Sequence, residues 1–573
     1  MIEKIWRIKD QPDEQSVLAL ADSLNISNIL ATILLNRKVT NFYEAKTYFR
    51  PDLEMLHDPF LMDGMQDATD RVIEAITNNQ KIVVYGDYDV DGTSSSALMY
   101  LFLKELDADV EVHIPNRLTD GYGLSNESID YLAEKKTELM ITVDCGITAV
   151  EEIAHASEHG IDTIICDHHK PKEIIPNAVA VLDPIKPGCE YPFKYLSGAG
   201  VAFKLARAVA DRVGQKDIVL QYLDLVALSA AADIVSLTDE NRILVRKGME
   251  LINTNPRPGI LALIKSAKKE PGTLTAGQIV FTIAPRINAV GRMGDAMRAV
   301  NLLVADTDSE AKELALVLED ENYKRRKIDE VTFSHAIELI DKTIDLETEL
   351  GIILHEESWH PGVIGIVASR VVEKYNRPAI MLSTIDGLAK GSARSISGFN
   401  IYQPLEMCKD LLLQFGGHEA AAGVTLEVEN IPKFRKRFNE ILRETMSNKD
   451  FSPVIKVDTK ISLSDITPKF IRVLDQFSPF GPGNMRPVFI SENVQLANYP
   501  RIVGKNHFLT SLRQNGSDKV FDTIGFNLGY FANVIDKEKD LLDIVYTIET
   551  ITKNGATFPQ IRLKDIKVKE NVN

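Results

Sequence analysis

The sequence predicts an α/β protein in which a long helix joins two α/β domains and an all-β domain follows them. Three observations predict this organisation. Short apolar runs alternate with helix-like runs from residue 81, a charged helix-like run covers residues 309–345, and short β-like runs broken by Gly- and Asn-containing turns begin near residue 453. A chain of 573 residues is long enough for about three to four domains.

The predicted elements follow in order along the chain. Residues 1–50 form an N-terminal helical extension, and residues 51–308 form the first α/β domain. In that domain the strand-like runs KIVVYGDY, ADVEVHIP, ELMITVD and DTIICDH alternate with runs of helical spacing such as SSSALMYLFLKEL. This alternation is typical of a doubly wound, largely parallel sheet, which binds ligands beyond the carboxyl ends of its strands.

The second half of the chain changes character twice. Residues 309–345 form a predicted connecting helix because their charges are mixed and the run is long. Residues 346–449 form a second α/β domain, which opens with a strand, a Gly-containing loop and a helix. Residues 453–573 are short β-like runs, as in a small barrel of the OB-like type.

Composition places the protein in a broad class. Apolar residues make up 45% of the chain and charged residues 26%, which is ordinary for a globular protein. The N-terminal stretch carries acids where a secretory signal needs an apolar core, and no run approaches about 18 apolar residues, so we expect a cytoplasmic protein with no membrane partner. The four cysteines form no CxxC pair, which argues against a disulfide framework or a zinc ribbon.

The net charge of −17 taken alone argues against a nucleic acid as partner. Net charge does not describe a single groove, however. A cluster of carboxylates that binds divalent cations presents positive charge to a ligand. An acidic chain is therefore compatible with a polyanionic substrate.

Potential metal ligands follow three of the predicted strands. Because the carboxyl ends of parallel strands meet at one edge of a sheet, we expect these side chains to converge. They are Asp87, Asp89 and Asp91 after the first strand, Asp144 after another, and Asp167, His168 and His169 after a third. A further acid, Asp233, lies in an otherwise small and apolar helix, where an unpaired carboxylate would be costly.

Each of these residues also has a structural interpretation. An acid after a strand is often a helix N-cap, a His-His pair is often a core or surface pair, and a helix acid can be satisfied locally. A calcium loop is disfavoured because position twelve, counted from Asp87, is Leu98 rather than Glu. The coincidence of ligands at several strand ends favours Mg²⁺ or Mn²⁺, two of which can activate a water and stabilise the leaving oxygen of a phosphoester.

A second group of residues suggests contacts to phosphate. Arginine matches phosphate oxygens in bidentate geometry, and paired glycines allow a close approach of backbone amides, although a lone Arg is more often a surface salt bridge and a GG pair more often a turn. Tyr122 could equally stack a base or be buried in a turn. The candidates are Arg117, Tyr122, Arg286, Asn288, Arg292, Ser392, Arg394, Gly416, Gly417 and His418.

The motifs GDYDVDG, PNRLTDGYGLS, TVDCG, CDHH and SAAADIVSL, in this order, resemble the successive motifs of the DHH phosphoesterase superfamily. SWHPGVIGIVASR, GSARSI and GGHEAAAG resemble its companion DHHA1 substrate-binding domain. PRINAVGRM, the connecting helix and FGPGNMRPVF before a β domain are most similar to the bacterial exonucleases of this superfamily that are specific for single-stranded DNA. The resemblance covers nearly the whole chain after residue 50.

The resemblance implies roles for these residues. The metal pair, two Mn²⁺ or Mg²⁺ ions, would be held by Asp89, Asp91, Asp144, His168 and Asp233. Asp144 would bridge the ions, His169 would orient the scissile phosphate and Asp87 would support the loop. The arginines Arg117, Arg286 and Arg292 would pair with the DNA backbone or its 5′ phosphate, and the second-domain candidates would bind phosphate facing the metal centre. Tyr85 departs from the pattern, because many superfamily members have His there, and this puts a first-motif histidine ligand in doubt.

The implied function is a metal-dependent 5′→3′ exonuclease that degrades single-stranded DNA to mononucleotides in repair and recombination. Its implied partners are single-stranded DNA, a helicase and a single-strand-binding protein, and the protein would be a monomer. Two alternatives stay open: a superfamily phosphodiesterase acting on short RNA or cyclic dinucleotides, and a non-catalytic replication scaffold. The C-terminal β domain argues against the first, and the intact carboxylates argue against the second.

Overall fold

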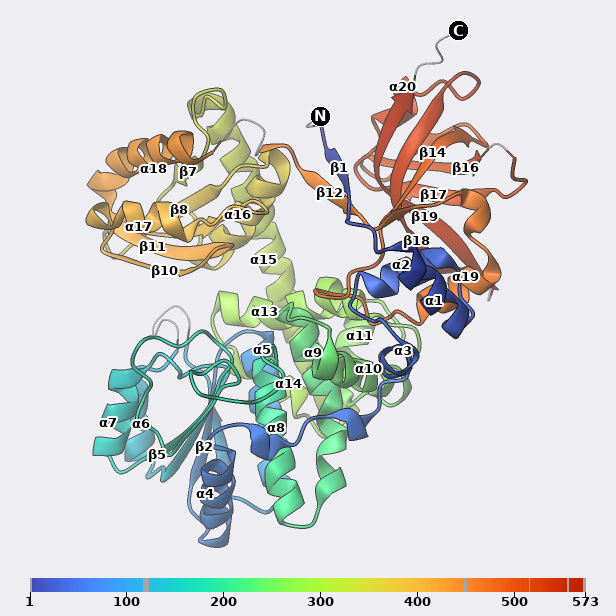
Figure 1. Cartoon of the computed structure of the whole chain (residues 1–573). Coiled ribbons are helices and arrows are strands. Elements are labelled where there is room, and N and C mark those ends of the chain that lie inside the picture. The colour runs from blue at the N-terminus through green and yellow to red at the C-terminus, as the bar shows by residue number, and fades with distance from the viewer. Residues whose placement is uncertain (1–2, 117–122, 447–450, 515, 554–555, 570–573) are drawn as a thin grey trace.

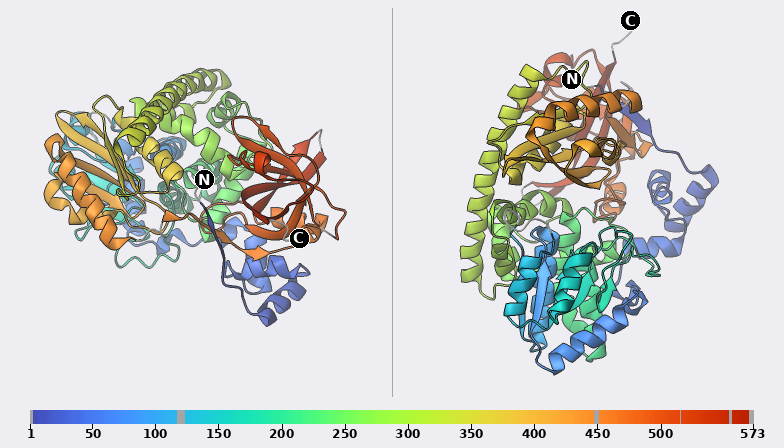
Figure 2. Two further views of the ribbon diagram at one scale, coloured as in Figure 1. Left: turned by 90° about the horizontal axis from the view of Figure 1, so that it is seen from above. Right: turned by 90° about the vertical axis from the view of Figure 1, so that its left-hand side faces the viewer.

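The computed structural model describes residues 3–116, 123–446, 451–514, 516–553 and 556–569. The first α/β domain forms the base of the molecule, and the second α/β domain and the β domain both lie above it (Figure 1). Seen from above, these two upper parts occupy opposite sides of the molecule (Figure 2). The predicted fold class, two α/β domains joined by a long helix and followed by an OB-like domain, is confirmed.

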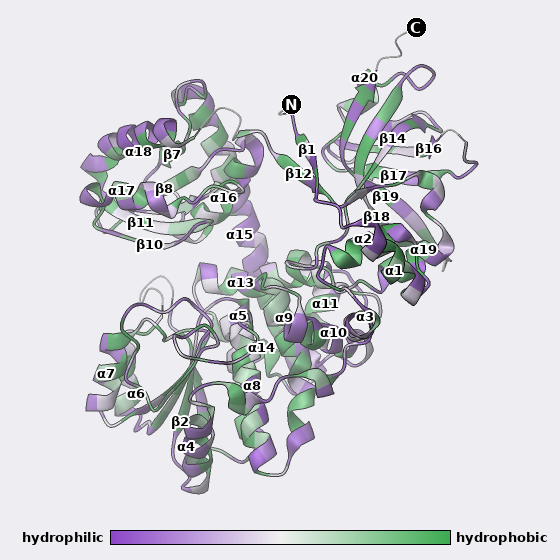
Figure 3. Cartoon of the chain, viewed as in Figure 1, coloured by the Kyte–Doolittle hydropathy of each residue, from purple (hydrophilic) through white to green (hydrophobic). Residues whose placement is uncertain are grey.

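The first domain contains a five-stranded parallel sheet of order β3-β2-β4-β5-β6. Its strands are β2 (Ile82–Gly86), β3 (Val110–His113), β4 (Leu139–Val143), β5 (Asp162–Cys166) and β6 (Ala180–Leu182). Every residue of β2 and β4 is buried, which explains their uninterrupted apolar sequences. Figure 3 shows these strands in green within an outer layer of helices that carry more purple.

Helices cover both faces of this sheet. On one face α4 (Met65–Thr77), α5 (Val90–Glu105) and α8 (Gly198–Arg212) pack against Val84 and Ile141. On the other face α6 (Asn126–Glu134) and α7 (Val150–Glu158) pack against Val83 and Met140. The remaining helices of the domain are α9 (Leu223–Ala232), α10 (Asp239–Thr254), α11 (Pro258–Ser266), α12 (Ala276–Gln278), a π-helical turn η4 (Ile279–Ile283), α13 (Ala284–Met293) and α14 (Met297–Leu303).

The connecting helix α15 (Asp308–Thr343) is 36 residues long and contacts both α/β domains. Glu319 accepts a hydrogen bond from Arg286 of α13 at 2.5 Å. Farther along, Asp329 and Glu330 pair with Arg370 of the second domain. The helix runs along one side of the molecule between the two domains (Figure 2).

The second domain has a mixed five-stranded sheet of order β10-β11-β9-β8-β7. The parallel pair is β7 (Ile352–His355) and β8 (Ala379–Ile385), joined through α16 (Pro361–Tyr375). The antiparallel strands are β9 (Leu388–Arg394), β10 (Gln414–His418) and β11 (Ala421–Glu427). One core lies under α18 (Ile431–Thr445) and α17 (Tyr402–Met407), and a second lies between the sheet, α15 and α16.

The third part is a barrel. A ring of five strands, β14-β18-β19-β17-β16, closes because β14 pairs with both β18 and β16. This is the OB-like arrangement that the short β-like runs predicted. Its elements are β12 (Val454–Val457), β13 (Thr459–Lys460), α19 (Pro468–Asp475), β14 (Phe489–Leu496), β15 (Arg501–Val503), β16 (His507–Gln514), β17 (Phe521–Gly525), α20 (Phe531–Val534), β18 (Leu541–Lys553) and β19 (Ala556–Lys569).

The N-terminal residues pack on the barrel. They form α1 (Glu14–Leu24), α2 (Asn28–Leu35) and α3 (Phe42–Phe49), whose buried side chains share one core with the barrel strands. They also include a strand that the sequence did not predict: β1 (Ile5–Ile8) pairs in parallel with β12.

The described part of the chain also contains short 3₁₀ helices. They are Leu53–Met55, Pro59–Leu61, Lys216–Tyr222, Lys409–Leu411, Val428–Asn430 and Leu463–Asp465.

Among the described helices, none by itself has the length and apolar character to cross a membrane. The consecutive helices α1 and α2 meet that criterion when taken together, but the chain bends by 111° between them.

The barrel contacts the first domain through Arg242 of α10. This residue is only 4% exposed. Its guanidinium donates to the backbone carbonyls of Phe477 at 2.9 Å, Ser478 at 3.1 Å and Tyr48 at 3.0 Å, and lies 3.9 Å from the centre of the Tyr48 ring. One side chain therefore satisfies carbonyls of the barrel segment and of the N-terminal extension. A buried cation that gathers several carbonyls is a strong constraint on how the parts sit together.

We expect Arg242→Met to destabilise the protein by about 2–4 kcal/mol, because buried carbonyl oxygens lose their donor. Thermal unfolding and limited proteolysis would show a lower Tm and faster cleavage near residues 476–484. The control Arg212→Met removes an exposed pair with Asp70 and should change stability by less than about 0.5 kcal/mol. Equal stability of the two variants would contradict the docking role of Arg242.

Candidate metal centre

The acidic loop after β2 leads directly into α5. Asp89 caps the helix, and its Oδ1 accepts from the backbone N–H of Asp91 at 2.8 Å and of Gly92 at 3.1 Å. A Cβ on Gly92 would lie 2.3 Å from the carbonyl oxygen of Asp87, so only glycine fits this turn. The N-cap interpretation of this acid is thus correct for Asp89, and it coexists with a place in the metal cluster described below.

Asp91 is buried and is held by contacts from distant parts of the chain. Its Oδ2 accepts from the N–H of Gly198 at 2.7 Å, and its Oδ1 accepts from the N–H of Ala199 at 2.8 Å and the hydroxyl of Ser229 at 2.6 Å. The first two donors lie at the N-terminus of α8, where the helix dipole favours a carboxylate. These contacts hold the carboxylate in one orientation.

Sequence reasoning missed Ser229 and the N-terminus of α8. Ser229 lies one turn before Asp233 in an apolar helix, which was a visible signal of a buried polar partner. The small residues of SGAGVAF at the start of α8 were a second signal, because small side chains admit a carboxylate to the backbone amides.

The ends of β4 and β5 bring further ligands to the same edge of the sheet. Asp144 follows β4 with a φ of 61°, and its side chain is buried. The Nε2 atom of His168 lies 3.1 Å from Asp144 Oδ1, 3.7 Å from Asp91 Oδ2 and 3.7 Å from Asp233 Oδ2. His168 therefore stands between carboxylates from three separate segments.

Asp167 and His169 form an adjacent pair. The Nδ1 atom of His169 lies 2.7 Å from Asp167 Oδ1, and Asp167 Oδ2 accepts from the N–H of Ile147 at 3.0 Å. Burial opposes the charged forms, but the hydrogen bond between them lowers the pKa of Asp167 and raises the pKa of His169 to about 9. The pair holds a cationic imidazole, 45% exposed, beside the metal ligands.

Three overlapping groups of ligand atoms each lie within 4.8 Å of one another. Asp144 and His168 each belong to two of these groups, so these two residues connect the three groups. The groups are Asp87, Asp89 and Asp144; Asp91, His168 and Asp233; and Asp144, His168 and His169. Asp87, which the resemblance assigned to loop support, therefore also offers a ligand atom.

The electrostatics favour a cation among these acids. Burial, together with the neighbouring carboxylates, raises the pKa of Asp89 and raises that of Asp144 well above its usual value, and it raises the pKa of Asp233 to about 8. Without positive charge these groups resist ionisation together. Oxygen ligands with one imidazole suit Mg²⁺ and Mn²⁺, so the donor set fits two such ions.

The α13 residues connect the metal loop to its surroundings. Asn288 Oδ1 accepts from the N–H of Val90 at 3.1 Å and so supports the first turn of α5. Arg292 donates to the carbonyl of Gly362, at the start of α16, at 3.2 Å. The guanidinium of Arg286 contacts Glu319 of the connecting helix and the carbonyl of Thr282. In this structure Asn288 contacts the metal loop, whereas Arg286 contacts α15.

The predicted phosphate residues of the second domain lie side by side through strand register. Across β10, β11 and β9, Gly416 pairs with Gly423 and Gly423 with Ser392. In the same way His418 pairs with Ala421 and Ala421 with Arg394. Gly416, Gly417 and His418 are exposed, and a Cβ on Gly416 or Gly423 would meet open space among the described residues.

Two predicted residues, Arg117 and Tyr122, lie outside the described residues. Tyr85 occupies the position where many superfamily members have His. Its side chain is fully buried, and its hydroxyl donates to the carbonyl of Gly123 at 3.1 Å. Tyr85 therefore packs in the core on the α6–α7 face of the sheet.

Comparisons with known proteins give consistent matches. The DHH family, N-terminal domain, matches residues 81–230, the DHHA1 domain matches residues 348–444, and the RecJ OB domain matches residues 457–565. The single-stranded-DNA-specific exonuclease RecJ of Bacillus subtilis (strain 168) is 38% identical over 569 residues, which cover 99% of this chain and 71% of that protein. The RecJ of Escherichia coli (strain K12) is 34% identical over 82% of this chain and 84% of that protein.

Solved structures agree with the sequence relatives. RecJ from Thermus thermophilus in complex with Mn²⁺ superimposes with a TM-score of 0.84 at 28% identity, over 99% of this chain and 80% of that one. An exonuclease RecJ bound to manganese has a TM-score of 0.59 at 35% identity, over 68% of this chain and 96% of that one.

A parallel sheet with carboxylates and histidines at one edge, followed by a DHHA1 domain, defines a phosphodiesterase of the DHH class. Within that class the OB domain and the extent of identity are specific. The chain belongs to the RecJ family. The resemblance inferred from the sequence motifs is confirmed.

Removing one acid should stabilise the metal-free protein. The pKa of Asp233 is about 8 in the folded chain against 3.8 for the ordinary group, so its contribution to stability is lost as the pH rises from about 4 to 8. In EDTA-treated full-length protein we expect Asp233→Asn to raise Tm at pH 8 by at least about 2–4 °C, with a smaller gain at pH 5.

Differential scanning fluorimetry with and without Mn²⁺ would measure this effect. Mn²⁺ should stabilise the wild type more than Asp233→Asn, because the variant lacks one ligand. Asp320→Asn, on the exposed surface of α15, is the control and should behave as wild type. A lower metal-free Tm for Asp233→Asn at pH 8 would overturn the account of carboxylate repulsion.

Proposed function

We propose that this protein is a metal-dependent exonuclease that degrades single-stranded DNA from its 5′ end and releases mononucleotides, in the service of DNA repair and recombination. The observation that carries the proposal is the convergence of acids from three chain segments and histidines from a fourth into overlapping groups that could hold metal ions, in a chain of the RecJ family. Its relatives are named single-stranded-DNA-specific exonucleases, and related structures hold Mn²⁺ or Mg²⁺.

Two divalent ions, Mn²⁺ or Mg²⁺, are the cofactors in this proposal. When bound, they supply an activated water and stabilise the oxygen that leaves the phosphorus. Asp144 would be a ligand at both ion positions. The remaining ligands would be Asp87, Asp89, Asp91, His168 and Asp233. A carboxylate oxygen of Asp87 lies in the same group as ligand atoms of Asp89 and Asp144, so Asp87 would bind metal as well as support the loop.

The other residues of the centre orient the reaction. His169, a half-exposed cation fixed by Asp167, would donate to a non-bridging oxygen of the scissile phosphate. Asn288 keeps the Asp89 loop at the start of α5, so it acts as a positioning residue. The negative charge on the phosphate would thus be stabilised by a hydrogen bond from His169, which Asp167 already holds in place, rather than by solvent.

The 5′ phosphate would bind to two sets of paired positions on the sheet of the second domain. The first set is Ser392, Gly416 and Gly423, and the second is Arg394 and His418. Amides and one guanidinium bind a phosphate without a large local excess of positive charge. If the 5′ end stops there, the bond one nucleotide inward lies at the metals, which gives mononucleotide products and 5′ polarity. Arg292, which contacts Gly362, would set the distance between the two sites.

A groove between the first domain and the barrel would carry the rest of the strand. Its volume is about 630 Å³, and it begins beside Asp233 at Ile234, which is 61% exposed. Exposed apolar side chains that suit base stacking accompany a set of cations that suits the backbone. The lining residues include Ile234, Phe281, Phe480, Met485, Lys9, Lys456, Arg486, Arg562 and Lys564.

Two features of the groove support this part of the proposal. Ile234 has a φ of 60°, a strained conformation for a β-branched residue, and such strain concentrates at functional sites. Burial and the charge of nearby Arg562 lower the pKa of Lys564. Phosphate would relieve this crowding of positive charge.

We divide the chain into an extension at 1–50, a DHH domain at 51–308, a connecting helix at 309–345, a DHHA1 domain at 346–449 and an OB-like domain at 453–573. The protein would act as a cytoplasmic monomer on single strands exposed by a helicase and covered by a single-strand-binding protein.

The first test is a time course on one single-stranded DNA oligonucleotide, labelled in turn at its 5′ and 3′ ends, with Mn²⁺ or Mg²⁺. Immediate release of labelled mononucleotide from the 5′ label, with progressive shortening of the 3′-labelled strand, is the expected result. Asp144→Asn should lower kcat by about 10³-fold or more while the circular dichroism spectrum is unchanged. A well-folded Asp144→Asn enzyme with wild-type activity would remove Asp144 from the mechanism.

Control substrates separate the alternatives. A blunt duplex should resist. Consumption of short RNA or a cyclic dinucleotide in place of DNA would keep the metal centre and replace the substrate, whereas no cleavage of any substrate with either metal would favour a scaffold.

The groove can be tested by the salt dependence of binding. In the inactive Asp144→Asn background, Arg562→Gln with Lys564→Gln should weaken binding of single-stranded DNA of any sequence. Each lost phosphate contact should reduce the slope of log K against log salt by about 0.7, as measured by fluorescence anisotropy. Lys569→Gln, which removes a pair with Asp543, is the control. An unchanged slope in the double variant would place the strand elsewhere.

A further inference from the structure

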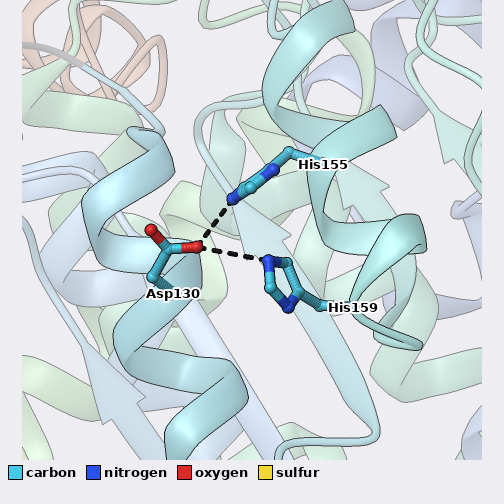
Figure 4. A group of neighbouring side chains, drawn as sticks. All are labelled: Asp130, His155 and His159. Atoms are coloured by element: carbon cyan, nitrogen blue, oxygen red, sulfur yellow. Dashed lines mark hydrogen bonds and ion pairs between the residues drawn. The ribbon is translucent and has the colours of Figure 1, made fainter.

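Three potential metal ligands meet on the outer side of the first domain, apart from the residues of the metal centre. Asp130 lies in the middle of α6, His155 lies in the last turn of α7, and His159 is the residue that ends α7. Figure 4 shows all three side chains pointing toward one another from the two neighbouring helices. None of them belongs to the three groups that form the metal centre.

The nitrogen and oxygen atoms converge on one point. The Nε2 atoms of His155 and His159 lie 2.7 Å and 3.2 Å from the same atom, Oδ1 of Asp130 (Figure 4). The two imidazole rings are 4.6 Å apart and nearly perpendicular. All three ligand atoms lie within 4.8 Å of one another.

This spacing is close to what a small ion requires. Ligands about 2.0–2.1 Å from a tetrahedral Zn²⁺ lie about 3.4 Å from one another, so the two N–O distances would need to open only slightly. The histidines are four residues apart, which puts both on one face of α7. The third ligand comes from a different helix, so binding an ion would tie α6 to α7.

The surroundings favour a cation of a particular kind. His155 and His159 lie at the C-terminal end of α7, where the helix dipole attracts positive charge. Two imidazole nitrogens and one carboxylate suit Zn²⁺ and related transition metals better than Mg²⁺, which prefers oxygen. The side chains are 27%, 40% and 56% exposed for His155, His159 and Asp130, so an ion can reach them from solvent.

We propose that Asp130, His155 and His159 form a second metal site that binds one Zn²⁺, or a similar transition-metal ion, with water completing the coordination. Its role is structural. It links the two helices whose inner residues, among them Ile129 and Ile153, pack on the sheet face opposite α5. Because α7 begins six residues after Asp144, the ion would also stabilise the helix that follows a ligand of the catalytic centre.

The test counts zinc in the full-length protein. Protein stripped with EDTA is dialysed against ZnCl₂, and bound zinc per chain is measured by mass spectrometry. The double variant His155→Gln with His159→Gln should bind one equivalent less than wild type. The variant Asp144→Asn with His168→Gln should lose zinc from the metal centre and keep the equivalent at α6 and α7.

Two controls separate a metal site from a general effect on folding. His57→Gln removes one imidazole that faces a single carboxylate, Asp239, and should bind as much zinc as wild type. Asp130→Asn keeps the size of the side chain but removes its charge, and should weaken zinc binding without unfolding α6. Mn²⁺-dependent nuclease activity should be unchanged in the His155→Gln, His159→Gln variant.

A thermal readout completes the design. With Mg²⁺ saturating, added ZnCl₂ should raise the Tm of the wild type and of His57→Gln but not that of the double histidine variant. Equal zinc counts for the wild type and the double variant would overturn the proposal and leave two imidazoles that share one carboxylate as hydrogen-bond partners. If zinc raised the Tm of the wild type and of the double histidine variant equally, the proposed role of the ion in linking α6 to α7 would be overturned.

Discussion

Mutual repulsion among buried carboxylates is the constraint on which the catalytic half of this protein depends. Asp89 and Asp91 lie at the start of α5, Asp144 follows β4 and Asp233 ends α9, yet all four lie at one edge of the parallel sheet. Burial in a low dielectric makes their joint ionisation costly unless cations lie among them. In the proposed function the same acids hold the divalent ions, so the repulsion between them would be relieved when the ions bind.

The surrounding structure meets that constraint with fixed donors. The amides at the start of α8 and the hydroxyl of Ser229 satisfy Asp91, while Asp89 accepts from the first amides of α5. Helix α13 then links this loop to the other domain. Gly291 approaches the carbonyl of Tyr88 so closely that a Cβ would lie 2.3 Å from it, and Arg292 reaches Gly362 of α16. A displacement of the second domain would therefore move α13 and, through it, the acidic loop after β2.

The local distribution of charge differs from the net charge of the chain. The net charge of −17 is an average over the whole sequence. Locally, the groove beside Asp233 is lined by five cations and two acids, so cations are in excess there. The cations are Lys9, Lys456, Arg486, Arg562 and Lys564, and the acids are Asp458, which pairs with Lys9, and Glu549, which pairs with Arg562. These residues are brought together because β1 pairs with β12 and because Arg242 holds the barrel on the first domain. Binding chemistry here is a property of the assembled surface rather than of the composition.

Much of the fold and of the metal centre could be predicted from the sequence, because the pattern that carries them is local. Uninterrupted apolar runs followed by helical spacing define parallel strands, and the chemistry of the residues after each strand is read directly. The strand, Gly-containing loop and helix after residue 346 and the short β-like runs after residue 453 likewise predicted the second domain and the barrel, and the family resemblance agreed with them. The i,i+4 pair His155 and His159 was equally visible in the sequence, but its partner Asp130 lies on another helix and was not.

Contacts between distant segments were decided by tertiary structure alone. The sequence could not show that Ser229 serves Asp91, that Asn288 supports the start of α5, or that Arg286 faces Glu319. It also could not show that strand register aligns Gly416 with Ser392, or that the N-terminal helices share the core of the barrel. The physical reason is that sequence patterns report which face of an element is apolar, whereas the partner of each polar atom depends on how those faces pack.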